Sequence, residues 1–407
     1  MSLRRRVAVT GMGVVSPIAL DVLTFRDRLL AGVSGVGVIS LFPPAALPTR
    51  IAAEVKWDGD VVRDRKITFA LEAARQAIKD ATSQGTRPEG IGGISLGIGL
   101  ELFSMEDLAT SRRPGFTLPP RQRDRLQFLQ MPSDICVHLI SHEHGLTAPP
   151  LTHVSACAAG TDAIGTAFWR VASGRCGWML AGGTDSMINP LGVAGFCSLG
   201  ALSRRNEEPA KASRPFAQGR NGFVLGEGAG ILVLEEYEAA RARGATIHAE
   251  IVGYGCSFDS HGISEPHPEG RGAFQAMTRA LADSNVTAED IDAVNAHGTS
   301  TPKNDPVETL ALKRLFGERA YRIPISATKS MIGHLISAAG AVEAIAAITC
   351  MEAGMVHPTI NLDVPDPACD LDYVPHVARP HRQRFVLSTS YGFGGQNAAL
   401  VLKVADA

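Results

Sequence analysis

The sequence predicts an α/β layered fold built from two similar halves. Short segments rich in valine and isoleucine, as expected of buried strands, alternate with longer helical stretches. No proline- or serine-rich linker divides the 407 residues, a length that allows two or three domains of about 150 residues or one large fold. We place the boundary in the charged segment Glu235 to Thr246. Residues 1–245 then form the N-terminal half and residues 246–407 the C-terminal half.

Each half is expected to contain its own series of strands and helices. The predicted strands are Arg6 to Thr10, Gly92 to Ile98, Leu151 to Ser155, Trp178 to Gly182, Gly230 to Glu235, His248 to Tyr254, Ile291 to Ala296, Ile323 to Ser326, Arg384 to Ser390 and Ala398 to Val404. The predicted helices are Thr68 to Thr82, Cys157 to Ser173, Gly272 to Asp283, Pro306 to Phe316 and Ile336 to Ala353. The polar, irregular segment Phe103 to His144 is interpreted as an insertion that caps a site or contacts a partner.

The composition is that of an ordinary globular protein. Hydrophobic residues make up 45% and charged residues 20%, which excludes disordered and collagen-like chains. The 42 glycines exceed the usual share of ~7% without a Gly-X-Y period, so they mark tight turns and close backbone approaches. With 39 basic and 41 acidic residues the net charge is −2, so we expect no nucleic-acid partner.

Cysteine usage and hydropathy favour a cytoplasmic protein. The seven cysteines are widely spread and none forms a C-x-x-C pair, which disfavours a disulfide framework or a zinc ribbon. The basic N-terminus precedes an apolar stretch, but Gly11, Gly13 and Pro17 interrupt it, so we do not interpret it as a signal peptide. No uninterrupted apolar run of ~18 residues occurs, and no membrane span is expected.

Three short motifs have competing interpretations. Gly11-Met-Gly13-Val-Val-Ser16 resembles a dinucleotide-binding turn but lacks the third glycine and the later acidic residue. Gly93-Ile-Ser95-Leu-Gly97 matches the nucleophile elbow of α/β-hydrolases, yet Ser95 lies inside an apolar strand pattern. Ser141-His-Glu-His144 lacks the H-E-x-x-H spacing of zinc sites and is interpreted as solvated helix-end histidines.

Cys157 is the first candidate catalytic residue. The segment from Leu151 reads as a buried strand that ends in a turn of small residues and starts a helix at Cys157. A helix N-terminus carries unpaired N–H groups and the positive end of the dipole, which stabilise a thiolate. A lone cysteine is more often a buried hydrophobic residue, so the case depends on the second half of the chain.

The second half adds two histidines and a glycine loop. His297 follows an apolar strand, and Lys329 precedes His334 on a glycine-containing loop before an alanine-rich helix. Gly392-Phe393-Gly394-Gly395 lies between two late strands, where its N–H groups could serve an oxyanion. Each feature alone has a structural explanation, but one cysteine and two histidines at strand ends together indicate acyl transfer.

These segments resemble the β-ketoacyl synthases (3-oxoacyl-[acyl-carrier-protein] synthases) of the elongating type. The matching segments are Ser155 to Gly160, Asn295 to Pro302, Lys329 to His334 and Gly392 to Gly395, with further matches at Val7 to Gly13, Ala181 to Asp185, Ser213 to Phe216 and Gly222 to Gly230. They occur in order over the whole chain. The resemblance implies the thiolase fold, a five-layered αβαβα arrangement of two duplicated halves that is normally dimeric.

The resemblance also implies the site residues. Cys157 would take an acyl chain from a carrier-protein thioester, while His297 and His334 would assist decarboxylation of a malonyl thioester. The roles implied for the other residues are an oxyanion hole from the N–H groups of Cys157 and Phe393, a gate at Phe393, support of the histidines by Lys329 with Glu343, further support from Asp305 and Glu308, and pantetheine binding by Thr299 and Thr301. Neither a metal nor an organic cofactor is implied, because phosphopantetheine on the carrier supplies the thioester.

Departures from the family pattern bear on the pathway. Ala217 stands where aspartate is usual, Gly97 to Met105 lacks a glycine-serine run, and Gln396 replaces a threonine that is common in fatty-acid enzymes. These features are closer to type II polyketide ketosynthases, of the polyene-forming kind, than to a housekeeping fatty-acid enzyme. Three other interpretations stay open: a non-catalytic chain-length-factor-like subunit, which would lack the nucleophile; a hydrolase using Ser95; and a thiolase-like acyltransferase, which would use a second cysteine as acid.

The expected partners follow from the chemistry. An acidic acyl carrier protein needs a basic rim, for which the candidates are Arg112, Arg113, Arg121, Arg204, Arg205 and Lys211. The chain is expected to form a homodimer or a heterodimer with a chain-length-factor-like subunit.

Overall fold

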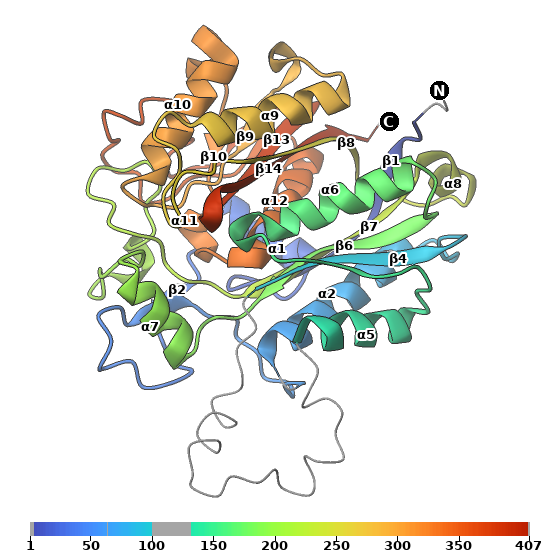
Figure 1. The fold of residues 1–407 in the computed structure, drawn as a ribbon, viewed down its shortest axis with the longest axis horizontal. Coiled ribbons are helices and arrows are strands. Elements are labelled where there is room, and N and C mark those ends of the chain that lie inside the picture. Colours follow the sequence, from blue (N-terminus) through green and yellow to red (C-terminus); the bar gives the residue numbers. More distant parts are fainter. Residues whose placement is uncertain (1–3, 63, 100–131, 406–407) are drawn as a thin grey trace, which may run out of the picture.

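A computed structural model describes residues 4–62, 64–99 and 132–405. Within these residues, ten strands form one sheet in the order β10-β9-β13-β14-β8-β1-β7-β6-β4-β5 (Figure 1). Their bounds are β1 Val7–Val15, β4 Gly92–Ile98, β5 Leu151–His153, β6 Trp178–Asp185, β7 Gly228–Glu236, β8 Ala249–Phe258, β9 Ala293–Asn295, β10 Ile325–Ser326, β13 Phe385–Gly392 and β14 Gln396–Val404.

The sheet contains the same five-strand topology twice. In chain order, the third, second, fourth, fifth and first strands of each half lie side by side: β5-β4-β6-β7-β1 and β10-β9-β13-β14-β8. The first three strands of each series are parallel, and the remaining pairs are antiparallel. The two series join where β1 pairs with β8, with Val7 opposite Ile251. The halves are therefore duplicated, as the thiolase fold requires.

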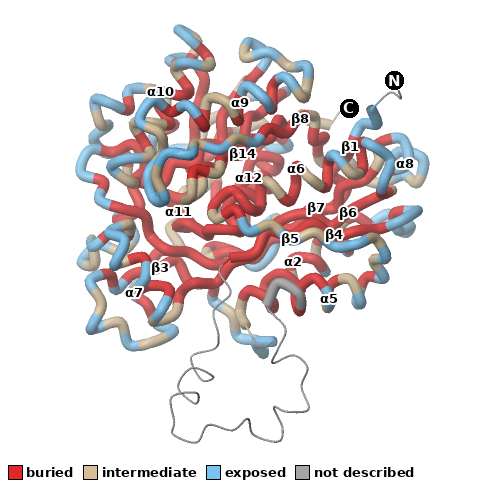
Figure 2. The backbone as a smooth tube through the Cα atoms, in the orientation of Figure 1, coloured by how far each residue is buried: buried red, intermediate tan, exposed pale blue. Residues whose placement is uncertain are grey.

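Helices and sheet halves alternate in five layers. The helices α2 (Arg65–Ala81) and α5 (Pro132–His144) cover the outer face of the first half, and α9 (Arg271–Ser284) and α10 (Asn304–Phe316) that of the second (Figure 1). Between the two sheet halves lie α6 (Ala159–Ala172) and α12 (Ala339–Ala353). Figure 2 shows that buried backbone is concentrated in the sheet halves and the helices between them.

Smaller elements complete the described chain. They are α1 Val22–Leu30, α7 Pro190–Ser198, α8 Tyr237–Ala242, α11 Lys329–Ile332, the strand pair β2 Val36–Val38 and β3 Ile51–Ala53, and the pair β11 Met355–Val356 and β12 Arg379–Pro380. Of these, only α8 was expected, as the helical connection between the halves. The others are short and are stabilised by tertiary contacts, which cannot be predicted from local sequence patterns.

The central helix α12 has no solvent-facing side. Every residue from Ala339 to Met351 is buried, because sheet strands cover the helix on both sides. Small residues allow the close approach: a Cβ on Gly230 of β7 would lie 2.8 Å from the Val342 nitrogen. Residues 336–353 are apolar and long enough, by composition, to cross a membrane, but 89% of that window is buried inside the protein. The apolar stretch is accounted for by the core.

All the strands and helices predicted from the sequence are present, with ends shifted by a few residues. The prediction of an irregular insertion over Phe103 to His144 is wrong for its last part, because Pro132–His144 is helix α5. Cys136 and Ile140, four residues apart, pack into the core beside α2 and hold this helix in place. Residues 100–131 lie outside the described residues.

The dinucleotide and hydrolase interpretations are wrong. Gly11 lies within β1, where a Cβ would come 2.1 Å from the Ala77 oxygen, so this glycine allows α2 to pack on the strand. Ser95 lies in the middle of β4, is fully buried, and has its hydroxyl 3.0 Å from His153 Nε2. A buried mid-strand hydroxyl cannot reach an ester.

The helix-end histidines were only partly anticipated. His142 is exposed at the end of α5, as expected, but His144 is buried. Burial lowers the pKa of His144, which outweighs the opposite effect of Glu143.

An ion-pair cluster joins α2 and α12 to the start of β8. His248 Nε2 lies 2.9 Å from Asp80 and Nδ1 lies 2.7 Å from Glu352. Burial alone would lower the pKa of His248, but the two carboxylates outweigh it and raise the pKa to about 9. The stabilisation is therefore complete below pH ~6.5 and is lost as the pH rises through about 9.

We predict that His248→Gln lowers the free energy of unfolding by about 2–3 kcal/mol at pH 6 and by much less at pH 10. The measurement is urea unfolding of both proteins across this range. A difference that stays constant from pH 6 to pH 10 would show that the imidazolium contributes nothing.

Candidate active site

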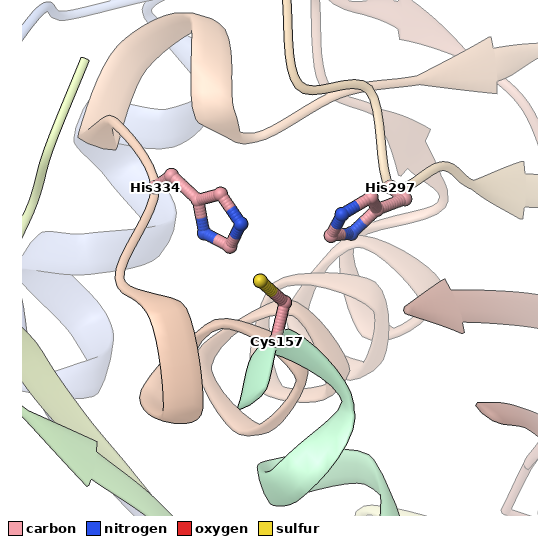
Figure 3. Close-up of side chains that lie close together, drawn as sticks. All are labelled: Cys157, His297 and His334. Carbon is pink, nitrogen blue, oxygen red and sulfur yellow. The ribbon is translucent and has the colours of Figure 1, made fainter. Parts of the chain in front are cut away.

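Three side chains from distant segments meet at one buried point. Cys157 lies on the short 3-10 turn Ala156–Ala158 that leads into α6, His297 follows β9, and His334 follows α11. Their sulfur and ring nitrogen atoms lie within 4.8 Å of one another, and all three residues are buried. Figure 3 shows the thiol pointing into the space between the two imidazoles.

The Cys157 turn has a strained backbone, and the Cys157 side chain is buried. Ala156, just before the nucleophile, has a φ of +48°, in the left-handed region that costs a non-glycine residue about 1 kcal/mol. Burial raises the pKa of the Cys157 thiol to about 11, against the opposing effect of the Phe393 N–H. The expectation that the helix N-terminus stabilises a thiolate is therefore wrong, because desolvation outweighs it.

His297 is held as a neutral ring with a defined tautomer. Lys329 Nζ lies 3.2 Å from His297 Nδ1 and donates to it, so the ring proton resides on Nε2. Burial and then the positive charge of Lys329 keep the pKa of His297 well below its usual value. The ring thus presents an N–H donor to the site at neutral pH.

His334 presents a second donor. The Ile336 N–H donates to His334 Nδ1 at 3.1 Å, which again leaves the proton on Nε2. Burial and the charge of Lys329 lower the pKa of His334 well below its usual value. The two rings lie 5.3 Å apart, edge to face, so both can donate to one oxygen atom between them.

Lys329 is fully buried and uses all three of its protons. Its Nζ donates to His297 Nδ1, to the His297 carbonyl oxygen at 2.7 Å and to Glu343 Oε1 at 2.5 Å. Glu343 also accepts from Thr328 at 2.9 Å. Burial raises the pKa of Glu343, while Lys329 opposes that shift. The Lys329–Glu343 ion pair therefore places an ammonium group next to the histidines, and the Glu343 carboxylate balances its charge.

Glu308 and Asp305 of α10 support the backbone around His297. The two carboxylate oxygens of Glu308 accept the N–H groups of His297 and Gly298, each at 2.8 Å. Burial raises the pKa of Glu308 to about 7, despite these hydrogen bonds. Asp305 accepts from the Phe216 N–H at 2.8 Å and from Thr299 at 3.4 Å.

A cavity of about 270 Å³ connects Cys157, His297 and His334 to the surface. Thr299 and Thr301 line it, with their hydroxyl oxygens 2.9 Å apart. Phe393 also lines it, at the start of a glycine turn in which Gly394 has a φ of +78°. A buried nucleophile in a cavity that exposed residues also line suits a substrate that reaches in on an extended arm.

Both halves of the chain match a known family. The model described as "Beta-ketoacyl synthase, N-terminal domain" matches residues 4–240, and "Beta-ketoacyl synthase, C-terminal domain" matches residues 248–363. The chain belongs to the β-ketoacyl synthase family. It is therefore a condensing enzyme of the acyltransferase type.

Relatives of this ketosynthase are known in sequence and in structure. The 3-oxoacyl-[acyl-carrier-protein] synthase 2 of Coxiella burnetii is 41% identical over 411 residues, which is 98% of each chain. A solved type II polyketide ketosynthase in complex with its acyl carrier protein is 32% identical, with a TM-score of 0.89 over 99% of this chain and 100% of that chain. The ishigamide ketosynthase/chain length factor is 33% identical, with a TM-score of 0.86 and the same coverage.

The catalytic, gate, supporting and pantetheine-binding residues that the sequence singled out lie at or beside this ketosynthase site, whereas the carrier-contact candidates Arg112, Arg113 and Arg121 fall outside the described residues. Cys157, His297, His334, Thr299, Thr301 and Phe393 line the cavity, while Lys329, Glu343, Glu308 and Asp305 lie behind it. The donors in the Cys157, His297 and His334 cluster suit an oxygen anion. A metal ion would bind a histidine through an unprotonated nitrogen. In both rings Nδ1 accepts a hydrogen bond, from Lys329 or from the Ile336 N–H, and the nitrogen that faces the site, Nε2, carries the proton.

Several cavity residues were missed. Phe223 packs edge to face on His334 at 5.1 Å, and Tyr391 packs on His297 at 5.6 Å. Asp259 and Ser264 also line the cavity, from the loop after β8. The run Ser260-His-Gly-Ile-Ser-Glu-Pro, rich in loop formers after a strand, was the available signal for that loop.

Two of the three departures from the family pattern are not part of the described cavity lining. Ala217 is buried in the core of the second half, and Gln396 opens β14. Neither lines the cavity, although the neighbouring Asn397 does. Residues 100–105 of the third departure fall outside the described part of the chain.

We predict that Lys329→Met destabilises the protein by about 3–5 kcal/mol, because it leaves the Glu343 carboxylate buried without its partner. Adding Glu343→Gln should restore most of the stability in urea unfolding. Malonyl-thioester decarboxylation should stay at least tenfold low in the double variant, because nothing then holds the His297 tautomer. Wild-type decarboxylation by the double variant would contradict a role of Lys329 at the histidine.

Proposed function

We propose that this ketosynthase catalyses decarboxylative Claisen condensation between an acyl chain on Cys157 and malonyl-[acyl carrier protein]. The observation that supports this most is the meeting of one thiol and two imidazole N–H donors within 4.8 Å at the end of a channel. The substrates arrive on carrier phosphopantetheine, so the thioester itself supplies the activation. No further cofactor enters the steps below.

The first step loads the acyl chain. The Cys157 sulfur attacks the thioester carbonyl carbon, the bond from that carbon to the carrier sulfur breaks, and the thiol proton ends on the departing carrier thiol. Negative charge develops on the carbonyl oxygen. The N–H groups of Cys157 and Phe393 both face the Cys157 sulfur and are the oxyanion donors in this proposal.

The second step generates the carbon nucleophile. The malonyl thioester loses CO2, and the electron pair of the broken bond moves onto the thioester oxygen as an enolate. The Nε2–H groups of His297 and His334 hold that oxygen. The enolate carbon then attacks the acyl carbon on Cys157, a carbon–carbon bond forms, and the carbon–sulfur bond breaks. Cys157 leaves as a thiolate and takes up a proton from solvent.

The surrounding residues have supporting roles in this proposal. Lys329, paired with Glu343, keeps His297 as a donor, and Glu308 and Asp305 hold the loop that carries it. Thr299 and Thr301 bind the pantetheine arm where it passes along the cavity. Phe393, half-buried and facing Phe196 at a ring distance of 6.5 Å, is the gate between the two half-reactions.

For the pathway, we propose elongation of a polyketide chain, of the polyene-forming kind. The sequence departures and the similarity to a type II polyketide ketosynthase support it. Fatty-acid elongation is the second candidate, favoured by the 41% identity to a 3-oxoacyl-[acyl-carrier-protein] synthase 2. Condensation rates with polyenoyl- and saturated acyl-carrier proteins of equal length would separate the two.

We also propose that the protein acts in the cytoplasm with a carrier protein and a second subunit. Strand β5 ends the sheet among the described strands, and Val154 just beyond it is 68% exposed. An open strand edge with an apolar neighbour suits pairing with another subunit. That subunit is a second copy or a chain-length-factor-like chain. The division into halves at residues 245 and 246, between α8 and β8, also remains a proposal.

Cys157→Ala should abolish the acyl adduct that wild-type protein forms with acyl-carrier protein, as read by intact-mass spectrometry. Cys256→Ala, which removes an exposed thiol, is the matched control and should leave the adduct in place. A full-mass acyl adduct on Cys157→Ala would contradict the proposed nucleophile.

Arg204→Glu should slow loading from acyl-carrier protein by about tenfold without slowing loading from a small acyl thioester. Arg204 is exposed and follows Ala201, which lines the cavity, whereas Arg205 and Lys211 pair with Glu208. The control is Arg241→Glu on α8. This helix lies far from α7, the helix that precedes Arg204 in the chain (Figure 1). If Arg204→Glu changed the rates of loading from both substrates by the same factor, this residue would be excluded from the carrier contact.

A further inference from the structure

A second turn repeats the backbone of the Cys157 turn. The 3-10 turn Ile336–Ala338 leads into α12 just as Ala156–Ala158 leads into α6, and Ile336 has a φ of +46° where Ala156 has +48°. The sequences Cys157-Ala-Ala-Gly160 and Ser337-Ala-Ala-Gly340 match at three of four positions. Ser337 therefore occupies in the second half the position that Cys157 occupies in the first.

The two turns are in direct contact. The Ser337 hydroxyl donates to the Ala156 carbonyl oxygen at 3.3 Å. A Cβ on Gly160 would lie 2.8 Å from the backbone carbonyl oxygen of Ser337, and a Cβ on Gly340 would lie 2.0 Å from Thr161 Oγ1. Only glycine at both positions permits this contact, so the duplicated helices meet at their N-termini.

A buried carboxylate holds Ser337 from the other side. Asp185, at the end of β6, is fully buried, and its Oδ2 accepts the Ser337 N–H at 3.1 Å. Its Oδ1 has no hydrogen-bond partner among the described residues. Burial raises the pKa of Asp185 to about 6, while Lys66 and the Ser337 N–H oppose that shift. Burying a carboxylate that is only partly hydrogen-bonded is costly.

The contact bears on the chemistry through one peptide group. The Ala156 carbonyl and the Cys157 N–H belong to the same planar trans peptide, so fixing the direction of one fixes the direction of the other. The Cys157 N–H is one of the two proposed oxyanion donors. Because Ala156 is in a left-handed conformation, this peptide needs an outside contact to keep its orientation.

We propose that Ser337, held by Asp185, is a positioning residue that orients the oxyanion donor of Cys157. The proposal rests on the proposed acyl transfer. In this proposal the turn Ile336–Ala338 has a function. It has the same backbone conformation as the Cys157 turn and carries a hydroxyl in place of the thiol. Ser337 and Asp185 act through the Ala156–Cys157 peptide and do not touch the substrate.

The test compares two reactions of the same sulfur. Transfer from octanoyl-N-acetylcysteamine needs the oxyanion donor, whereas alkylation by iodoacetamide needs only an accessible thiol. Ser337→Ala and Asp185→Ala should slow acylation by at least about tenfold and change alkylation by less than about threefold. Asp185→Asn, whose amide oxygen can still accept the Ser337 N–H, should acylate within about threefold of wild type.

Matched controls remove equivalent groups elsewhere. Ser326→Ala removes a buried hydroxyl of the same half. Glu250→Gln neutralises a buried carboxylate that pairs with Arg6 near the start of β8, at the strand ends opposite to Asp185. Hydrogen exchange of peptides covering residues 154–162 reports the turn without any substrate. It should speed up in Ser337→Ala and Asp185→Ala but not in the controls.

The outcomes separate this proposal from the function on which it rests. If wild-type protein is alkylated but never acylated, the proposed function fails, and hydrogen exchange alone decides the positioning. Unchanged acylation and exchange in Ser337→Ala would overturn the proposal. Equal losses of acylation and alkylation, in step with the melting temperature, would also overturn it, as would an Asp185→Asn variant as slow as Asp185→Ala.

Discussion

The structure depends on the packing of α6 and α12 between the two halves of the sheet. Both helices are covered on two sides, so they need small residues wherever a strand or the other helix approaches closely. Gly160, Gly230 and Gly340 mark those approaches. The packing brings the two helix N-termini together, and with them the turns of Cys157 and Ser337. A chemical site at this point follows from the duplication, because each half contributes one helix start.

The electrostatics of the site follow from burial. In water, an imidazole near neutral pH would be partly charged, but at this site desolvation and the Lys329 ammonium keep His297 and His334 neutral. Lys329 is tolerated because Glu343 and two acceptors on His297 satisfy its protons. The result is an ammonium group that does not line the cavity and two N–H donors that do. Such donors need little reorganisation when an oxyanion forms.

Much of the fold could be predicted because its strands and helices are short, buried and regular. The segment Gly92 to Ile98 was predicted with the bounds of β4, since a short run of isoleucine, leucine and glycine between turn formers has few other solutions. The elements that were missed, such as α7 and the β2–β3 pair, are stabilised by tertiary contacts. The Cys157 pKa was predicted in the wrong direction. The helix N-terminus is visible in the sequence, but the depth of burial that outweighs it is not.

The sequence by itself determined the α/β class, the family and the identity of Cys157, His297, His334 and Lys329 as the chemical set, because these residues stand in ordered motifs. Only the tertiary structure decided which proton each histidine carries, which carboxylate holds which loop, and that Ser337 faces the nucleophile turn. The repeat of Cys-Ala-Ala-Gly as Ser-Ala-Ala-Gly was present in the sequence. Its meaning depends on two helix starts, 180 positions apart along the chain, touching in the core, and only packing brings them into contact.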